Sequence, residues 1–162
     1  MKVLITGGTI DKQYNPLNGS LVFNQSSVSD MIERSRTTLN IDLEVLMMKD
    51  SLDVNNTDIQ LMVDSCNNTE HEHVVITHGT DTIIKSALFI SENLKSNKTV
   101  VLLGAMIPYQ FKDSDAFFNF GCALSAVQTL PHGVYITMNG QIFLPDDVAK
   151  NLTKGIFERI NV

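Results

Sequence analysis

The sequence is poor in basic residues and contains no long apolar run. Lys and Arg number 12 against 18 Asp and Glu, which gives a net charge of −6. A protein with this charge balance has no general attraction for a phosphate backbone, so we expect no nucleic-acid partner. A transmembrane helix needs roughly 18 or more consecutive apolar residues. No segment of this chain approaches that length, so we expect no membrane partner either.

Cysteine is also scarce, since Cys66 and Cys122 are the only two and lie in separate helix-like segments. Isolated cysteines of this kind are expected to be free buried thiols in a reducing compartment. The opening Met1-Lys2-Val3-Leu4-Ile5 lacks the charged, apolar and small-residue regions of a secretory signal. We therefore expect a cytoplasmic protein.

The residues that are abundant describe an ordinary globular chain. Hydrophobic residues make up 43% and charged residues 19% of the 162 positions. These values are typical of one folded domain with a substantial core. Composition alone indicates no function.

Short apolar runs alternate with helical patterns along the chain. Strands are predicted at residues 3–5, 43–47, 73–77, 99–103 and 133–138, and at 141–144 after a tight Asn139-Gly140 turn. Helices are predicted at 27–39, 57–66, 83–94 and 117–130, the second with Thr57 as its N-cap. Turn residues within 11–25 predict a hairpin or lid loop. Continuous apolar strands separated by helices indicate an α/β domain, with a parallel sheet between two helical layers as in Rossmann- and flavodoxin-like folds.

Polar and glycine-rich segments follow four of these predicted strands. In parallel α/β folds, ligands bind outside the carboxyl ends of the strands. The segments at those ends are rich in Gly, Thr, Ser and Asp, and they comprise residues 6–10, 49–53, 78–81 and 104–108. The coincidence predicts a ligand site at this edge of the sheet.

The first of these segments is Thr6-Gly7-Gly8-Thr9-Ile10. It does not fit the dinucleotide-binding pattern, because no third glycine follows and the next residues are typical of a loop. A glycine pair beside threonines permits close backbone approach to a ligand, with a hydroxyl pointing into the site. A purely structural junction between strand and turn explains the same residues about as well.

Three histidines near the third segment invite a chemical interpretation. His78 begins His78-Gly79-Thr80-Asp81-Thr82, where the exposed N–H groups of a beginning helix would hold an anion. His78 itself is more typical of a packing residue at a strand end than of a catalytic base. His71 and His73 lack the Cys and His partners of a metal site, which favours a surface strand entry. We expect no metal and no cofactor.

Read together, four motifs resemble the bacterial-type L-asparaginase/glutaminase family. They are Thr6-Gly7-Gly8-Thr9-Ile10, His78-Gly79-Thr80-Asp81-Thr82, Gly104-Ala105-Met106-Ile107-Pro108 and Asp147-Val148-Ala149-Lys150. Their order and approximate spacing match the family's N-terminal domain over essentially the whole chain. The resemblance implies that residues 1–162 are a short form with a catalytic domain of the N-terminal type and without the C-terminal domain of the longer members.

The resemblance also implies an enzyme that deamidates L-asparagine, and L-glutamine more weakly, through an acyl-enzyme. Thr9 would be the nucleophile, and Tyr14 would be the activating tyrosine of the loop. Thr80 would assist the attack or activate water, with Lys150 as base and Asp81 orienting it. A threonine hydroxyl needs such a base, although the charge of Asp81 favours the protonated form of Lys150.

The same resemblance supplies a substrate clamp. Ser51 would bind the α-carboxylate, Asp81 and Thr80 would complete the pocket with Asp81 meeting the α-ammonium, and the Ala105 carbonyl would receive the leaving amide nitrogen. Leu52 departs from the family, since many members have glutamine there.

Leu52 and the length of the chain leave two other functions open. One is a non-catalytic or weakly active domain that binds or senses an amino acid. The other is an amidase subunit acting on a larger amide substrate, although the acidic charge disfavours a tRNA-linked one. A homodimer or higher homo-oligomer is expected, because a site formed by loops at a sheet edge gains from a partner that covers it.

Overall fold

A computed structural model of the chain describes residues 1–95 and 97–160. Its largest sheet has six strands in the order β4-β1-β5-β6-β7-β8. These strands are β1 (Lys2–Gly7), β4 (Asp42–Lys49), β5 (His73–Thr77), β6 (Thr99–Leu103), β7 (Gly133–Met138) and β8 (Gln141–Phe143). The first five in this spatial order are parallel to one another, which confirms the predicted fold class.

The edge strand β8 runs antiparallel to β7, as the predicted tight Asn139-Gly140 turn between them implies. Asn139 and Gly140 have φ angles of 55° and 74°. Two successive positive φ angles form the kind of two-residue turn that reverses a chain directly into a hairpin. A parallel strand would instead require a long crossover connection.

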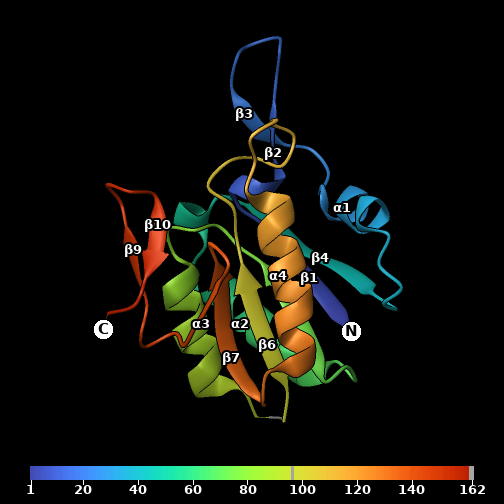
Figure 1. Ribbon diagram of the computed structural model, residues 1–162, viewed down its shortest axis with the longest axis vertical. Helices are drawn as coiled ribbons and strands as arrows, with labels where there is room; N and C mark the ends of the chain where they lie inside the picture. The colour runs from blue at the N-terminus through green and yellow to red at the C-terminus, as the bar shows by residue number, and fades with distance from the viewer. Residues whose placement is uncertain (96, 161–162) are drawn as a thin grey trace.

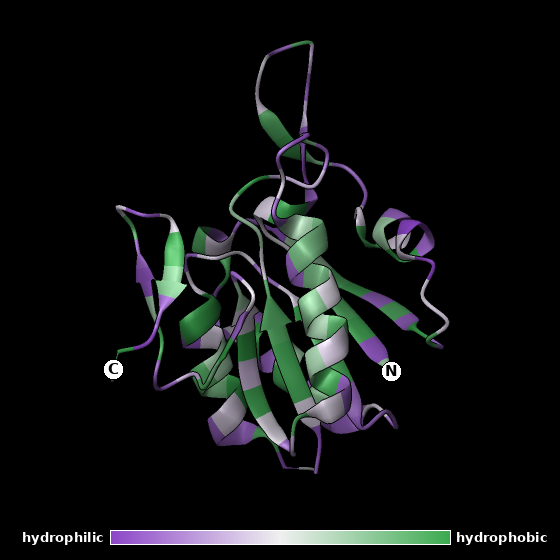
Figure 2. Ribbon diagram, viewed as in Figure 1, coloured by the Kyte–Doolittle hydropathy of each residue, from purple (hydrophilic) through white to green (hydrophobic). Residues whose placement is uncertain are grey.

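Two helical layers cover the sheet (Figure 1). One layer holds α2 (Asn56–Asn68) and α3 (Ile83–Asn93), and the other holds α1 (Val28–Ser35) and α4 (Ala116–Thr129). Alternate strand residues face alternate layers: Leu4 and Ile76 pack with α2 and α3, whereas Val3 and Val75 pack with α1 and α4. The central strands β5 and β6 are therefore apolar on both faces. In Figure 2 this is seen in the hydrophobic colouring of β6, whereas the edge strand β4 carries hydrophilic bands.

Two helix boundaries differ from the sequence prediction for local reasons. Helix α1 ends at Ser35 rather than Leu39, because Arg36 takes a left-handed conformation and donates its N–H to the Glu33 carbonyl. Helix α2 begins at Asn56, and the prediction of Thr57 as N-cap is wrong. Asn55 is the N-cap instead: its side chain accepts the N–H of Asp58, whose carboxylate accepts the N–H of Asn55. This reciprocal capping box satisfies two backbone donors that an unassisted helix start leaves open.

Two small hairpins extend beyond the main sheet. The predicted hairpin within 11–25 forms from β2 (Lys12–Tyr14) and β3 (Leu21–Phe23), and it projects from one end of the molecule (Figure 1). The second pairs β9 (Ala149–Asn151) with β10 (Ile156–Glu158). Residues 146–151 have the composition of a charged surface turn, yet Val148 and Phe157 are buried and anchor this hairpin in the core. Among the described residues, no helix is both long and apolar enough to cross a membrane.

Candidate active site

The carboxyl ends of four adjacent parallel strands meet at one edge of the sheet. The Gly8 N–H donates to the Lys49 carbonyl at 2.8 Å, which joins the turns after β1 and β4. A methyl group on Gly8 would lie 2.5 Å from the Gly79 nitrogen, and one on Gly79 would lie 2.4 Å from the Ser51 Cβ. Such close backbone approach requires glycine at both positions. The turns that the sequence predicted to share an edge therefore do so.

Thr9 begins a short 3₁₀ turn, η1 (Thr9–Asp11), immediately after the glycine pair. Gly8 has φ 79° and ψ −178°, a conformation that L-residues rarely adopt, and this sharp change of direction ends β1. Ile10 and Asp11 are buried below the turn, whereas Thr9 is only half-buried. The turn thus leaves Thr9 accessible at the sheet edge while its neighbours anchor it.

Lys150 reaches the same edge from the β9–β10 hairpin, far away in the sequence. Its ammonium donates to Thr80 Oγ1 at 2.8 Å and to Asp81 Oδ1 at 2.5 Å. Asp81 Oδ2 in turn accepts the Ser51 hydroxyl at 3.3 Å. The Lys150 side chain is only 12% exposed, and that of Asp81 is 44% exposed. Four residues that the sequence predicted as site residues are consequently joined by consecutive hydrogen bonds.

The turn that carries Thr80 and Asp81 precedes helix α3 rather than starting it. Helix α3 begins at Ile83, and the N-cap residue Thr82 makes no side-chain capping bond. Its hydroxyl donates instead to the Ser51 carbonyl at 2.8 Å. Residues 80 and 81 therefore lie in the turn before α3, and the expectation that the helix begins at these residues is wrong.

Ala105 lies fully buried in the turn that follows β6. Asp115 holds this turn by accepting the N–H groups of Met106 and Ile107, each at 3.0 Å. Gly104 approaches the Thr80 segment, because a methyl group there would lie 2.9 Å from Thr80 Cγ2. The predicted residue Ala105 thus borders the same group of side chains.

Tyr14 is the predicted site residue that the structure does not bring to this group. It lies on β2 in the projecting hairpin and is 55% exposed. Within the described part of the chain, it makes no hydrogen bond to Thr9, Thr80 or Lys150. Leu52 is 74% exposed beside Ser51, the predicted clamp residue, so this departure from the family pattern faces solvent.

Beside this group of side chains, Lys12 and Asp50 form an ion pair. The sequence did not predict this ion pair. Lys12 begins the projecting hairpin, and Asp50 precedes Ser51, so the pair ties the base of the hairpin to the Ser51 turn. The hydrogen bond from Lys12 holds the pKa of Asp50 below its ordinary value. The two residues are far apart in the sequence, and the pairing of β1 with β4 brings them together. No local sequence pattern could therefore predict this contact.

His78 is buried beneath the turn, and burial lowers its pKa by disfavouring the charged ring. Its Nδ1 lies 2.8 Å from the Gly79 carbonyl, a contact that requires a protonated Nδ1 in the neutral ring. His78 Nε2 is buried and has no hydrogen-bond partner among the described residues. These surroundings fit a packing residue at the strand end.

Asp11 is another buried titratable group and, unlike His78, was not indicated by any sequence motif. Its Oδ1 accepts the Ser27 N–H at 2.8 Å and the Ser26 hydroxyl at 2.9 Å, which closes the base of the hairpin onto helix α1. Its Oδ2 is buried without a hydrogen-bond partner among the described residues. Burial raises the pKa of Asp11 from 3.8 to about 6, partly offset by the two hydrogen bonds.

This raised pKa predicts a specific pH dependence of stability. Because the folded pKa lies above the ordinary value, the folded chain holds a proton between about pH 4 and pH 6 that the unfolded chain releases. The stabilisation is fully present below about pH 4 and is lost as the pH rises through 6, by about 3 kcal/mol in total. Asp11→Asn should remove this component, so the free energy of unfolding of wild type relative to Asp11→Asn should fall across that range. Urea unfolding at pH 4.5 and 7 measures it, and a difference independent of pH would contradict the assignment.

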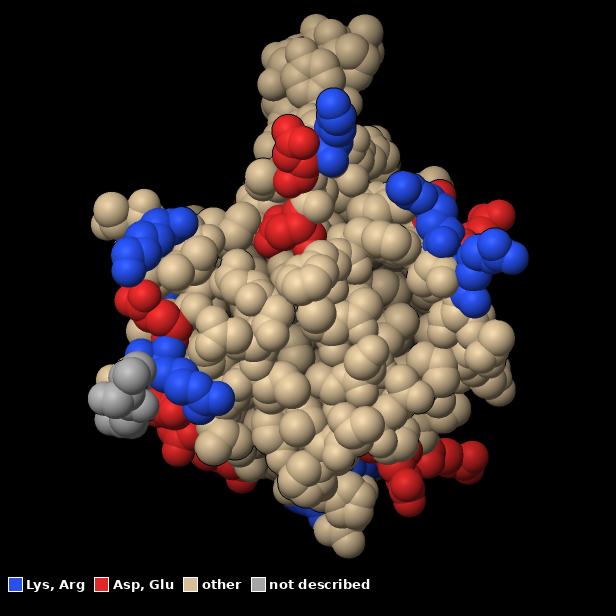
Figure 3. Space-filling view, viewed as in Figure 1, with Lys and Arg blue, Asp and Glu red and all other residues tan. Residues whose placement is uncertain are grey.

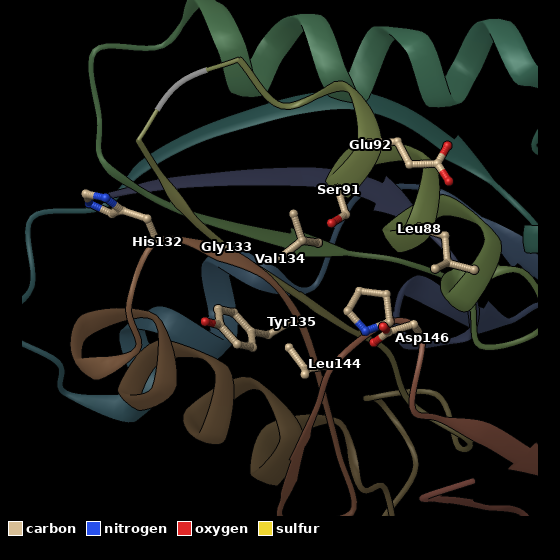
Figure 4. A pocket seen from close by; sticks show the side chains of 10 residues that line it. Leu88, Ser91, Glu92, His132, Gly133, Val134, Tyr135, Leu144 and Asp146 are labelled. Carbon is tan, nitrogen blue, oxygen red and sulfur yellow. The ribbon is translucent and has the colours of Figure 1, made fainter. Parts of the chain in front are cut away.

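We searched the described residues for a metal site and for pockets away from this edge of the sheet. No group of three or more His, Cys, Asp or Glu side chains in the described residues could hold a metal ion. A pocket of about 450 Å³ lies elsewhere, between α3, β7 and the segment after β8. Figure 4 shows its lining, with His132 and Glu92 at opposite ends rather than converging. It contains none of the predicted site residues.

A model of the N-terminal domain of asparaginases matches residues 1–161 of this chain. The chain belongs to the asparaginase family. This finding confirms the resemblance that the four sequence motifs indicated.

Several proteins are similar to the chain in sequence or in fold. The chain is 30% identical over 164 residues to a probable periplasmic L-asparaginase of Haemophilus influenzae, covering 95% of this chain and 47% of that protein. It is 30% identical over 145 residues to one subunit of the glutamyl-tRNA(Gln) amidotransferase of Archaeoglobus fulgidus, covering 86% and 34%. The crystal structure of a probable cytoplasmic L-asparaginase from Campylobacter jejuni superposes with a TM-score of 0.86 at 26% identity, covering 99% and 52%. The chain thus spans about half the length, or less, of these asparaginase-family relatives.

Proposed function

We propose that this chain is an amidohydrolase that converts L-asparagine to L-aspartate and ammonia, with L-glutamine as a weaker substrate. The observation that carries the proposal is the hydrogen-bonded series from Lys150 through Thr80 and Asp81 to Ser51, at the edge that also bears Thr9. This group offers a hydroxyl nucleophile, a second hydroxyl, an acid and an amine within one site. Membership of the asparaginase family supports the reaction, and residues 1–162 are proposed to form its catalytic domain.

In the first step we assign the attack to the Thr9 hydroxyl. Its oxygen bonds to the side-chain amide carbon, the carbon–nitrogen bond breaks, and the hydroxyl proton leaves with the nitrogen as ammonia. An ester between Thr9 and the aspartyl group remains. In the second step water attacks that ester, one water proton returns to the Thr9 oxygen, and L-aspartate departs.

Proton transfer in this scheme is assigned to Thr80 and Lys150. The 2.8 Å hydrogen bond between them allows Thr80 to exchange a proton with Lys150 while its hydroxyl faces the reacting water. To act as the base, Lys150 must give up its ammonium proton and regain one within each turnover. Tyr14 is proposed to reach Thr9 when its hairpin closes over the substrate, as lids commonly do.

Substrate recognition is assigned to groups that flank the same series. The hydroxyl and backbone of Ser51 would bind the α-carboxylate, and Asp81, helped by Thr80, would bind the α-ammonium. The Ala105 carbonyl would accept a hydrogen bond from the leaving amide nitrogen. The exposed Leu52 provides no polar contact, which lowers the expected affinity by roughly 1–3 kcal/mol if a substrate N–H stays unpaired.

Ammonia release from a panel of L-asparagine, L-glutamine, D-asparagine and N-acetyl-L-asparagine tests the proposal, with Thr9→Ala as the matched blank. We expect turnover of L-asparagine to exceed that of the other compounds and Thr9→Ala to release no ammonia above background. Equal turnover by wild type and Thr9→Ala would remove the nucleophile assignment. Thermal stabilisation by L-asparagine with no ammonia release would replace the enzyme by the amino-acid-binding alternative.

The similarity to an amidotransferase subunit keeps a larger amide substrate as a second candidate. Its chemistry at the reacting amide would be the same, and the difference lies in what holds the rest of the substrate. On the face shown in Figure 3, Lys and Arg lie at the periphery among Asp and Glu and form no continuous basic surface. A tRNA-linked substrate would need such a surface, so we favour the free amino acid.

Assembly and location complete the proposal. We infer a homo-oligomer, supported by the uncharged centre of the face in Figure 3, where helix α4 contains no charged residue and exposes Phe117 and Phe118. A cytoplasmic location is supported by the free Cys66 and Cys122 and by the resemblance to the probable cytoplasmic enzyme of C. jejuni. Sedimentation velocity and cell fractionation measure the two properties, and a monomer or an exported protein would contradict them.

A further inference from the structure

The strand that carries Lys150 is fixed by its partner strand. Lys150 pairs with Phe157 across the β9–β10 hairpin, and the Phe157 side chain is fully buried. The Phe157 N–H does not remain within the hairpin. It donates to the side-chain oxygen of Asn139 at 2.8 Å. The position of the Lys150 strand therefore depends on a residue at the end of β7.

Asn139 is also hydrogen-bonded to helix α4. Its own N–H donates to Asn119 Oδ1 at 3.2 Å. Asn119 is fully buried, and its Nδ2 donates to the Gly104 carbonyl at 3.1 Å and to Asp115 Oδ2 at 2.9 Å. Gly104 precedes Ala105, and Asp115 holds the N–H groups of the next two residues. Two asparagines thus connect the Lys150 hairpin to the Ala105 turn by consecutive hydrogen bonds.

The turn between β7 and β8 does not by itself require an asparagine side chain at position 139. A turn with positive φ at its first residue accommodates glycine as well as asparagine. Among the described residues, the hydrogen bond that the Asn139 side chain makes is the one it accepts from the Phe157 N–H. Asn119 has a related property, because only a side chain that both donates and accepts can bond to the Gly104 carbonyl and the Asn139 N–H together.

We propose that Asn139 and Asn119 are positioning residues that hold the Lys150 strand and the Ala105 turn at a fixed separation. This inference rests on the proposed function, in which Lys150 moves a proton and Ala105 receives the leaving nitrogen. Neither asparagine touches the reacting atoms. Their effect reaches the site through the backbone of Phe157 on one side and of Gly104 on the other.

Replacement of Asn139 by glycine tests the connection, because glycine tolerates the φ of 55° and removes only the side chain. We expect kcat for L-asparagine to fall about 10- to 100-fold, the cost of misplacing a reacting group. KM should change by less than about threefold, since Ser51 lies outside the hairpin and Asp81, although bonded to Lys150, is held by the turn before α3 and by Ser51. Asn139→Asp keeps an oxygen acceptor for the Phe157 N–H and should retain kcat within about threefold of wild type.

Amide hydrogen exchange provides a readout that does not depend on activity. Exchange across residues 149–158 should be faster in Asn139→Gly than in wild type or Asn139→Asp, while β5 and β6 remain protected. An unchanged kcat in a folded Asn139→Gly, or an equal fall in both variants, would overturn the positioning role. A wild type without ammonia release would overturn the proposed function instead. In that case faster exchange in Asn139→Gly would still support the connection, and unchanged exchange would refute it.

Discussion

Lys150→Met is expected to lower kcat for L-asparagine by about 10²–10⁴-fold, the range that positioned acid–base groups contribute. The substitution removes the 2.8 Å bond to Thr80 Oγ1 and the 2.5 Å bond to Asp81 Oδ1 while keeping a similar chain length. Stability should change by only about 1 kcal/mol, because Asp81 remains 44% exposed and regains water when the ion pair is lost. The variant is therefore expected to stay folded and bind substrate while turning over slowly. Single-turnover ammonia release and urea unfolding measure the two effects.

Lys150→Arg distinguishes proton transfer from charge alone. Arginine keeps the positive charge and the ion pair with Asp81, but it does not lose its proton in proteins. If Lys150 acts as a base, the Arg variant should be nearly as slow as the Met variant. Recovery of more than about a tenth of wild-type kcat would show that a fixed charge suffices. Lys154→Met is the matched control, because that lysine lies 65% exposed on the same hairpin and, among the described residues, forms an ion pair only with Glu158.

The sequence predicts the architecture well wherever one local pattern determines one element. Continuous apolar runs identified β1, β5 and β6, because strands buried on both faces show no polar alternation. The placement of residues 6–10 and 78–81 at one edge followed from the same rule, since parallel strands end at a common edge. Asn139-Gly140 also predicted its turn, because few residue pairs accept two positive φ angles.

The contacts that the sequence could not predict are those between segments that meet only in the folded chain. Nothing local distinguishes Asn119 from any other polar residue on a helix, yet it is fully buried between two turns. The pairing of Lys12 with Asp50 depends on the register of β1 against β4. Tyr14 shows the converse case, because it was predicted as a site residue and the structure does not bring it to the others. It lies apart from the other predicted site residues, because the β2–β3 hairpin projects from the domain.

Gly8→Ala is expected to destabilise the fold by about 2–5 kcal/mol. Positive φ costs an L-residue about 1–2 kcal/mol, and Gly8 has φ 79°. The new methyl group would also lie 2.5 Å from the Gly79 nitrogen and 2.6 Å from its Cα. These are backbone atoms of the neighbouring turn, so no side chain can rotate aside, and overpacking of this kind costs about 1–3 kcal/mol more. Urea unfolding with a two-state fit measures the loss.

Gly121→Ala is the matched control, because it makes the same chemical change in the opposite setting. Gly121 lies within α4, has ordinary helical backbone geometry, and would place its methyl group with nothing within 4 Å. Alanine there should stabilise the protein by roughly 0.5–1 kcal/mol, since glycine is a poor helix former. The two variants should therefore shift stability in opposite directions. A Gly8→Ala protein as stable as wild type would mean that the turns after β1 and β5 can separate, and that the backbone contact holding Thr9 beside the Thr80 turn is not fixed.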